Sequence, residues 1–276
     1  MSRSAVPDSA EGAIGSGGGP VSLIPKISFQ TVSAEREQDW NRGALAAPVT
    51  SPLIGIWRYS GTAVVQGCSQ SFPDPGLAGV PLVKRAAGGG AVLVGPWMLS
   101  FSIALPLNHP LVAGGLVESY RWLGELIVDE LDRIGICAHA VHPAELHERN
   151  RENELRWACF GGLSPWEVTV GNRKIAGLAQ RRTRNGVLFA AGILVEPSPW
   201  EILCDVLGQD SAATAYLSAN TVSCADVIGR PVSSFDLGVM IDRALVKKLF
   251  CMAVPDQSSV SNSRRKPGQF EFIAAM

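Results

Sequence analysis

Closely spaced cysteines are missing from this sequence. Its six thiols show no CxxC pair, and both zinc clusters and dithiol redox motifs depend on such pairs. The four histidines are not spaced as metal ligands, and no G-x-S-x-G nucleophile turn is present. We therefore expect free thiols in a reducing compartment, no metal site and no serine-hydrolase triad.

An excess of charge of one sign is also missing, as are long apolar runs. The chain has 24 Lys and Arg against 25 Asp and Glu, so no long-range field attracts it to nucleic acid or to an anionic membrane. No stretch approaches the roughly 20 apolar residues of a membrane span, and the N-terminus lacks the apolar core of a secretory signal. The composition predicts a cytoplasmic protein that recognises its partners locally, with no nucleic-acid and no membrane partner.

The chain has 276 residues, of which 46% are hydrophobic. This is enough for one large core. Residues 1–25 are rich in Gly, Ser and Ala and predict a flexible leader, because they contain too few large apolar groups to offset the entropy of ordering. Residues 256–276 begin with a polar, basic stretch and predict a C-terminal tail. Residues 26–255 remain as a single main domain.

Short runs of β-branched and aromatic residues, broken by Gly and Pro, predict strands within residues 53–70 and 91–105. Apolar residues at steps of three and four predict one long helix between Leu111 and Ile134, with Leu116 and Tyr120 on its buried stripe.

Two dipeptides that tolerate positive φ, Gly171-Asn172 and Asn185-Gly186, separate three further strand-like segments. They predict antiparallel strands over residues 166–170, 173–180 and 187–195. Ser198 as N-cap, with Pro199 at the first helical position, predicts a helix reaching about Leu207, and a last helix is expected over residues 234–250. Regular βαβ alternation is missing, so we predict an α+β fold with a mixed, largely antiparallel sheet flanked by helices.

The most unusual local feature is a run of three glycines that follows two cations and leads into a strand. The residues are Lys84, Arg85, Gly88, Gly89, Gly90, Ala91 and Val92. A backbone without side chains can approach a ligand closely and direct its amides at phosphate or carbonyl oxygen. No Gly-Lys-Ser/Thr follows, which excludes a Walker loop. A flexible turn with solvated charges is the alternative.

Two more residues could carry chemistry. Lys174 begins a strand whose next residues, including Gly177, are small and leave room above the sheet, so its charge could hold a carbonyl or phosphate oxygen. Cys159 lies fifteen residues earlier and could act as a nucleophile if nearby cations favoured its thiolate. A solvated hairpin lysine and an inert packing cysteine are the alternatives.

In this order and spacing, the motifs resemble the lipoate-protein ligase and octanoyltransferase family, which shares its fold with biotin protein ligase. The resemblance rests on residues 56–59 and 64–70, the Lys-Arg and GGGAV loop, the long predicted helix, and residues 173–181. It extends over about residues 30–250.

The resemblance implies a tunnel in which the Gly-rich loop covers an acyl chain and Lys174 meets its carbonyl oxygen. A cysteine at position 159 is similar to octanoyltransferases that form an acyl thioester. It implies that Cys159 attacks an octanoyl thioester on acyl carrier protein, that Lys174 steadies the oxyanion, and that a lysine of a lipoyl domain receives the acyl group. Lys84, Arg85, residues 88–92 and Gly177 would contact substrate, and no cofactor would be needed.

Two alternatives remain. An ATP-dependent ligase would use free lipoate or octanoate, ATP and Mg to form lipoyl-AMP, with Lys84, Arg85 and the glycine amides at the phosphates. Only about 26 residues follow the last predicted helix, whereas ligases of this family carry a further C-terminal domain, so we favour transfer. The family's His-Asp after GGGAV is replaced by Leu93-Val94, and its later His-Gly by residues 189–192. A noncatalytic acyl-binding relative is therefore the second alternative.

Overall fold

The structure is a computed structural model that describes residues 29–71, 79–146 and 155–250. The predicted leader and tail lie outside these residues. The elements in chain order are β1 (Phe29–Val32), α1 (Ala34–Ala44), β2 (Leu53–Tyr59), β3 (Ala63–Gln66), β4 (Leu82–Lys84), β5 (Val92–Val94), β6 (Met98–Leu105), the 3-10 helix η1 (Pro110–Val112), α2 (Gly115–Glu118), α3 (Arg121–Asp132), β7 (His139–Ala140), the 3-10 helix η2 (Pro143–Glu145), β8 (Val168–Val170), β9 (Arg173–Thr183), β10 (Gly186–Leu194), α5 (Trp200–Val206), α6 (Ser211–Asn220), α7 (Cys224–Ile228) and α8 (Ser234–Phe250).

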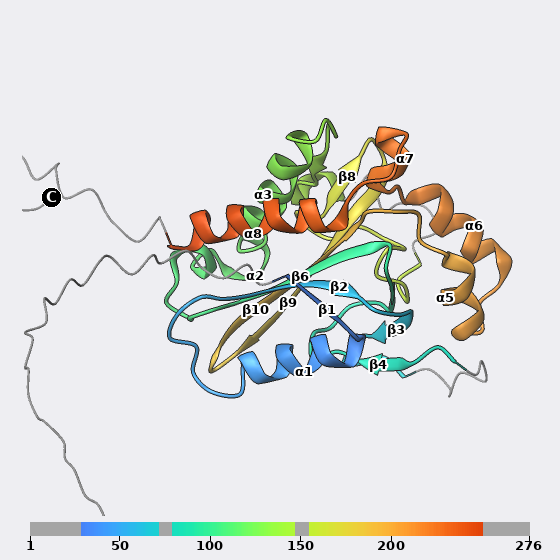
Figure 1. The fold of residues 1–276 in the computed structure, drawn as a ribbon. Coiled ribbons are helices and arrows are strands. Elements are labelled where there is room, and N and C mark those ends of the chain that lie inside the picture. Colours follow the sequence, from blue (N-terminus) through green and yellow to red (C-terminus); the bar gives the residue numbers. More distant parts are fainter. Residues whose placement is uncertain (1–28, 72–78, 147–154, 251–276) are drawn as a thin grey trace, which may run out of the picture.

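A seven-stranded sheet in the order β1-β2-β6-β10-β9-β8-β7 forms the centre of the fold (Figure 1). Its neighbouring strands are antiparallel except for β1 and β2, which are parallel. A second sheet has three strands in the order β4-β3-β5. The predicted fold class, a mixed and largely antiparallel sheet with flanking helices, is confirmed.

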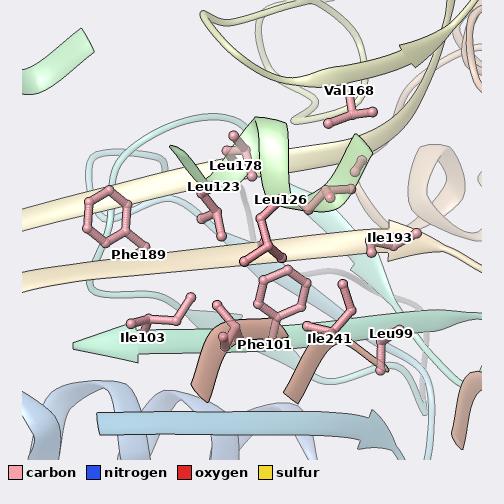
Figure 2. Close-up of a cluster of buried hydrophobic side chains, with 14 of the residues drawn as sticks. Leu99, Phe101, Ile103, Leu123, Leu126, Val168, Leu178, Phe189, Ile193 and Ile241 are labelled. Atoms are coloured by element: carbon pink, nitrogen blue, oxygen red, sulfur yellow. The ribbon is translucent and has the colours of Figure 1, made fainter. Parts of the chain in front are cut away.

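One face of the large sheet carries the main core. Leu99, Phe101 and Ile103 alternate along β6, which places their side chains on the same face of the sheet. There they pack with side chains from α3 and α8, including Leu123 and Ile241 (Figure 2). All five of these side chains are fully buried. This face is closed by aliphatic and aromatic packing.

The opposite face of the sheet is covered by α1 and the small sheet (Figure 1). Helix α1 begins at a Ser33 N-cap whose side chain accepts a hydrogen bond from the Arg36 N–H. Its buried side chains are unusually polar, because Glu37, Gln38 and Asn41 all lie on its inner side. This face therefore combines an apolar sheet surface with polar groups from the helix above it.

The predicted strands and turns are confirmed in their order. Residues 53–70 contain β2 and β3, residues 91–105 contain β5 and β6, and β8, β9 and β10 follow as an antiparallel set. Gly171, in the first predicted turn, has φ of 57°, which a residue with a side chain rarely adopts. The last helix spans residues 234–250 as predicted.

The single long helix predicted between Leu111 and Ile134 is wrong. The segment instead forms η1, α2 and α3, because Pro110 starts a 3-10 turn and Gly115 has φ of 84°. Leu116 is 59% exposed rather than part of the core.

The predicted Ser198 cap is also wrong. Pro199 occupies the N-cap position of α5, and Ser198 Oγ is buried without a hydrogen-bond partner. Helices α1 and α6 were not anticipated from the sequence.

Among the helices in the part of the chain that the structure describes, none is long and apolar enough to cross a bilayer.

Candidate active site

Two adjacent hollows lie near the Gly-rich loop, and the inner one is on the α1 side of the large sheet. The inner pocket, about 60 Å³ in volume, is bounded by the large sheet, the small sheet and α1. The outer cleft, about 590 Å³, lies between the Gly-rich loop, α2 and the loop around Gly162. Four residues line both hollows: Arg85, Cys159, Leu178 and Ala179. The half-buried thiol of Cys159 therefore lies at the boundary between the narrow pocket and the wider cleft.

The floor of the inner pocket consists of small residues in register across three strands. One row joins Gly177 of β9, Gly192 of β10 and Ser100 of β6, and the next pairs Ala179 with Ala190. The walls are apolar and include Val65, Val92, Val94, Met98 and Phe160. The short floor residues leave the space that the pocket occupies.

The loop that carries Cys159 is bound to the start of β5. The Ala91 N–H donates to the Trp157 carbonyl, and the Cys159 N–H donates to the Ala91 carbonyl, each at 2.7 Å. The side chain of Gln70 also donates to the Trp157 carbonyl at 2.9 Å. A Cβ atom at Gly90 would lie within 2.6–2.9 Å of the backbone of this loop. The Gly-rich segment thus fixes the position of the thiol by direct backbone contact.

The Gly-rich loop is itself held by two arginines. Arg85 donates to the Gly90 carbonyl at 2.9 Å, and Arg181 donates to the carbonyl of Ala86. Gly89 has φ of 96°, which requires glycine. These contacts argue against a loosely solvated turn, the alternative that the sequence left open.

Lys174 is buried beside Cys159, with its ammonium group fully occupied. Its Nζ donates to the carbonyl oxygens of Cys159 at 2.6 Å and Gly162 at 3.0 Å, and to Oε2 of Glu167 at 2.6 Å. Only 3% of the lysine side chain and 2% of the glutamate side chain are exposed. Because an ammonium group has three protons, this arrangement leaves none directed at an empty site.

Glu167 was missed by the sequence analysis. Besides Lys174, it accepts hydrogen bonds from the N–H groups of Ser164 at 2.7 Å and Leu178 at 3.0 Å. Lysines are almost never fully buried unless they are paired. The sequence left open whether Lys174 was solvated, so it gave no signal for a partner carboxylate.

Cys159, Lys174 and Gly177 lie together as predicted, although Lys174 lines neither hollow. A Cβ atom at Gly177 would lie 3.6 Å from Cys159 Sγ and 3.5 Å from Lys174 Cε. Gly177 and Val92 line the inner pocket, and Gly88, Gly89 and Gly90 line the outer cleft.

Two other predicted contact residues are placed differently. Ala91 acts through its backbone and is completely buried. Lys84 is exposed and lines neither hollow, so a contact between Lys84 and substrate stays a prediction.

A polar cluster at the α1 end of the inner pocket was not anticipated. Tyr59 Oη donates to Glu37 Oε2 at 2.5 Å, and Ser100 Oγ donates to Glu37 Oε1 at 3.2 Å. Burial raises the pKa of Glu37 above its ordinary value. Asn41 lies one turn further along α1 and lines the same pocket.

The other described cysteines lie outside both hollows. Cys68 and Cys137 are exposed, whereas Cys204 and Cys224 are buried. Burial raises the pKa of the Cys224 thiol to about 12, which makes it a poor nucleophile. Within residues 29–71, 79–146 and 155–250, no group of three or more His, Cys, Asp or Glu side chains could hold a metal ion.

The sequence that forms these hollows matches a known protein family. The model of the lipoyl protein ligase A/B catalytic domain matches residues 51–233, about two thirds of the chain. The chain belongs to this family. The matched segment contains every element of the two hollows except α1. For this lipoyl protein ligase A/B domain, the resemblance noted in the sequence is confirmed.

Relatives of known name support the same placement. The domain is 32% identical over 186 residues to an octanoyltransferase LipM of Kyrpidia tusciae, which covers 66% of this chain and 65% of that protein. It is 31% identical over 182 residues to the octanoyltransferase LipM of Moorella thermoacetica, covering 64% and 65%. The match thus spans just under two thirds of the length of these relatives.

Solved structures show the same fold. Protein Ta0514 from T. acidophilum with bound lipoic acid has a TM-score of 0.59 at 17% identity, covering 80% of this chain and 84% of that one. Lipoate-protein ligase A bound with ATP has a TM-score of 0.53 at 20% identity, covering 72% of each chain. At these identities the likeness concerns the fold alone.

Proposed function

We propose that this protein transfers an octanoyl or related medium-chain acyl group to a lysine of a lipoyl-domain or related carrier protein, through a thioester on Cys159. The observation that carries the proposal is the position of this thiol at the boundary between a narrow, mainly apolar pocket and a wider cleft. Each buried methylene would contribute about 0.8 kcal/mol to binding. In this arrangement the acyl chain lies in the inner pocket. The carrier protein and the acceptor lysine approach through the outer cleft.

The reaction needs two displacements at the same carbonyl carbon. The Cys159 thiolate attacks the octanoyl thioester of acyl carrier protein; a new C–S bond forms, the carrier's C–S bond breaks, and the carrier thiolate takes a proton from water. The neutral amine of the acceptor lysine then attacks. A C–N bond forms, the Cys159 thiolate leaves, and the surplus proton passes to water. Neither step consumes a cofactor.

Lys174 is proposed to steady the oxyanion of both displacements. Its Nζ can do so by exchanging a hydrogen bond to the Cys159 or Gly162 carbonyl for one to the acyl oxygen, while Glu167 remains its partner. The outer cleft is also lined by Arg85, Gly88, Gly89 and Gly90, and Gly90 directly contacts the loop that carries the thiol. They are proposed to cover the acyl group.

An ATP-dependent ligase is the second candidate, supported by the size and lining of the outer cleft. Its glycine backbone and Arg85 would suit the phosphates of ATP, with Mg bound by ATP itself. The fold neighbour bound with ATP is a lipoate-protein ligase. Free lipoate or octanoate would then replace acyl carrier protein as the donor. The absence of turnover with either donor would leave a noncatalytic acyl-binding protein.

The test is intact-mass spectrometry of the purified protein after incubation with octanoyl acyl carrier protein. We expect one octanoyl adduct that hydroxylamine removes and that Cys159→Ser abolishes. Cys68→Ser is the matched control, because Cys68 is exposed and lines neither hollow. An adduct that survives in Cys159→Ser contradicts the proposal. Release of pyrophosphate from lipoate, ATP and Mg, without an adduct on Cys159, favours the ligase.

A further inference from the structure

Strands β8 and β9 pair with one extra residue on β9. Val168 of β8 lies opposite Ala176, whereas the next residue, Thr169, lies opposite Lys174. Ile175 is therefore an additional residue between two pairs, which is the arrangement of a β-bulge. Bulges of this kind change the direction of a neighbouring side chain and are frequent beside active sites.

The bulge decides on which face of the sheet Lys174 lies. Because side chains alternate along a regular strand, Lys174 would share a face with Ala176, which belongs to the main core together with Ile175. Instead, Lys174 lies on the side of Gly177, where a Cβ atom would be 3.5 Å from Lys174 Cε and 3.6 Å from Cys159 Sγ. The extra residue thus moves the lysine from the main core to the side of the thiol.

The bulge does not fix the end of this side chain, because a flexible four-carbon stem separates the backbone from the ammonium group. Glu167, the residue before β8, places its Oε2 atom 2.6 Å from Lys174 Nζ. Its carboxylate also accepts hydrogen bonds from the N–H groups of Ser164 and Leu178, and the residue is only 1% exposed. Glu167 is therefore a fixed anchor for the ammonium group.

The other two partners of Lys174 Nζ are the backbone carbonyl oxygens of Cys159 and Gly162. A carboxylate attracts the ammonium group with a full opposite charge, whereas a carbonyl offers only a dipole. Either carbonyl can therefore be exchanged for another oxygen at a smaller loss than the carboxylate can.

We propose that Glu167 is a positioning residue for acyl transfer, which holds the ammonium group of Lys174 beside Cys159 while Nζ exchanges one backbone carbonyl for the acyl oxygen. This inference deepens the proposed function and rests on it for the reaction at Cys159. Glu167 acts through Lys174 and does not bind the substrate itself. A displacement of about 1 Å at a reacting group can cost roughly a hundredfold in rate, so loss of the anchor slows the reaction without weakening donor binding.

The test is a double-variant cycle measured on the first displacement. Intact-mass spectrometry follows the transfer of octanoate from octanoyl acyl carrier protein to Cys159 at a series of carrier concentrations. These data give the acylation rate at saturation and the half-saturating concentration. We expect Glu167→Gln to lower the saturated rate at least about tenfold and to leave the half-saturating concentration near wild type.

The Lys174→Met background separates positioning from structural support. No ammonium group remains there for Glu167 to hold, so Lys174→Met and Lys174→Met/Glu167→Gln should acylate Cys159 equally fast. A carboxylate that merely supported the cleft would slow the reaction by the same factor in both backgrounds. That result overturns the inference, as does a wild-type rate in folded Glu167→Gln or a change confined to the half-saturating concentration.

Glu130→Gln is the matched control. Glu130 is a buried carboxylate on α3, 3.2 Å from Arg133, and lines neither hollow. We expect it to keep the wild-type rate, and a slowing equal to that of Glu167→Gln would overturn the specific role of Glu167. Circular dichroism checks that each variant is folded. If Glu167→Gln alone does not fold, the two Lys174→Met proteins still decide, because the double variant leaves no unpaired buried charge.

The two proposals fail in different ways. A wild-type protein that forms no adduct contradicts acyl transfer itself, and the positioning role with it. An adduct on Cys159 that forms equally fast in wild type and in folded Glu167→Gln contradicts only the role of Glu167 and leaves acyl transfer intact.

Discussion

At the scale of single residues, the ion pair of Lys174 and Glu167 decides how the site is held. Both side chains are almost completely buried, and each also bonds to backbone groups around Cys159 and β9. A charge in such a place is tolerated because its partner and hydrogen bonds replace water. The pair therefore stabilises the structure around Cys159, in addition to any role in the reaction.

Replacing one member of this pair should lower the free energy of unfolding far more than replacing both. We expect Lys174→Met to destabilise the protein by about 3–5 kcal/mol, because it leaves the Glu167 carboxylate buried and unpaired. The double variant Lys174→Met/Glu167→Gln should recover a large part of that loss. Urea denaturation followed by circular dichroism measures both.

The control for this pair is a surface ion pair. Arg42 and Asp39 are 2.7 Å apart, with exposed fractions of 52% and 60%. Arg42→Met should change the free energy of unfolding by less than about 1 kcal/mol. Equal losses in the single and double variants of Lys174 would refute the importance of the unpaired charge.

At the scale of elements, the Gly-rich loop and the Cys159 loop form one unit. Their backbones touch at Gly90 and are joined by the two hydrogen bonds of Ala91. Arg181 fixes the loop from β9, and Arg182, the next residue, donates to the carbonyls of Val112 and Gly115 in the segment across the cleft. Strand β9 thus positions the segments on both sides of the outer cleft.

Adding one methyl group to this loop should show which glycines position the thiol. Gly90→Ala would place Cβ within 2.9 Å of the Cys159 loop, whereas a Cβ at Gly88 meets nothing within 4 Å. A displacement of about 1 Å at a reacting group can cost roughly a hundredfold in rate. We expect Gly90→Ala to slow acylation of Cys159 at least tenfold and Gly88→Ala to leave it near wild type, as measured by single-turnover mass spectrometry. Similar rates for the two variants would contradict this role of Gly90.

At the scale of the whole molecule, the large sheet has two unlike faces. The face under α3 and α8 is packed tightly with aliphatic and aromatic side chains (Figure 2). The face under α1 contains the inner pocket and the buried Glu37 network, which ties α1 to β2 and β6. The closed core and the inner pocket therefore lie on opposite faces of the sheet.

The buried Glu37 should give the whole protein a pH-dependent stability. Burial raises its pKa above the ordinary 4.5, while hydrogen bonds from Tyr59 and Ser100 and the charge of Arg85 oppose this without cancelling it. Protonated Glu37 contributes to the free energy of unfolding in full below pH 4.5, and this contribution is lost as pH rises through the raised pKa of the folded state. The loss occurs because the native state then has to release a proton that it binds more tightly than the unfolded chain does.

We therefore expect Glu37→Gln to remove a decline in unfolding free energy that wild type shows above pH 4.5. The slope from one such proton is at most about 1.4 kcal/mol per pH unit. Urea denaturation at a series of pH values measures the difference between the two proteins. A wild-type stability that stays constant relative to Glu37→Gln across this range, or that falls relative to it on acidification, would show that the Glu37 pKa is not raised.

The amino-acid sequence by itself determined the features that depend on local chemistry. Gly171 and the Asn185-Gly186 pair marked the turns between β8, β9 and β10, because few residues adopt the backbone angles required there. The glycine triplet stood out by residue type alone, whereas Cys159 was given a role by the resemblance to the family's motifs.

The tertiary structure decided what depends on contacts between distant segments. Glu167 pairs with Lys174 only because the loop before β8 folds back over β9, and Asn41 faces the pocket only because α1 covers the floor of the sheet. Helix α1 has no apolar stripe that would reveal its buried face, since Glu37, Gln38 and Asn41 occupy it. Burial of polar side chains is set by their partners across the fold, and no local pattern encodes those partners.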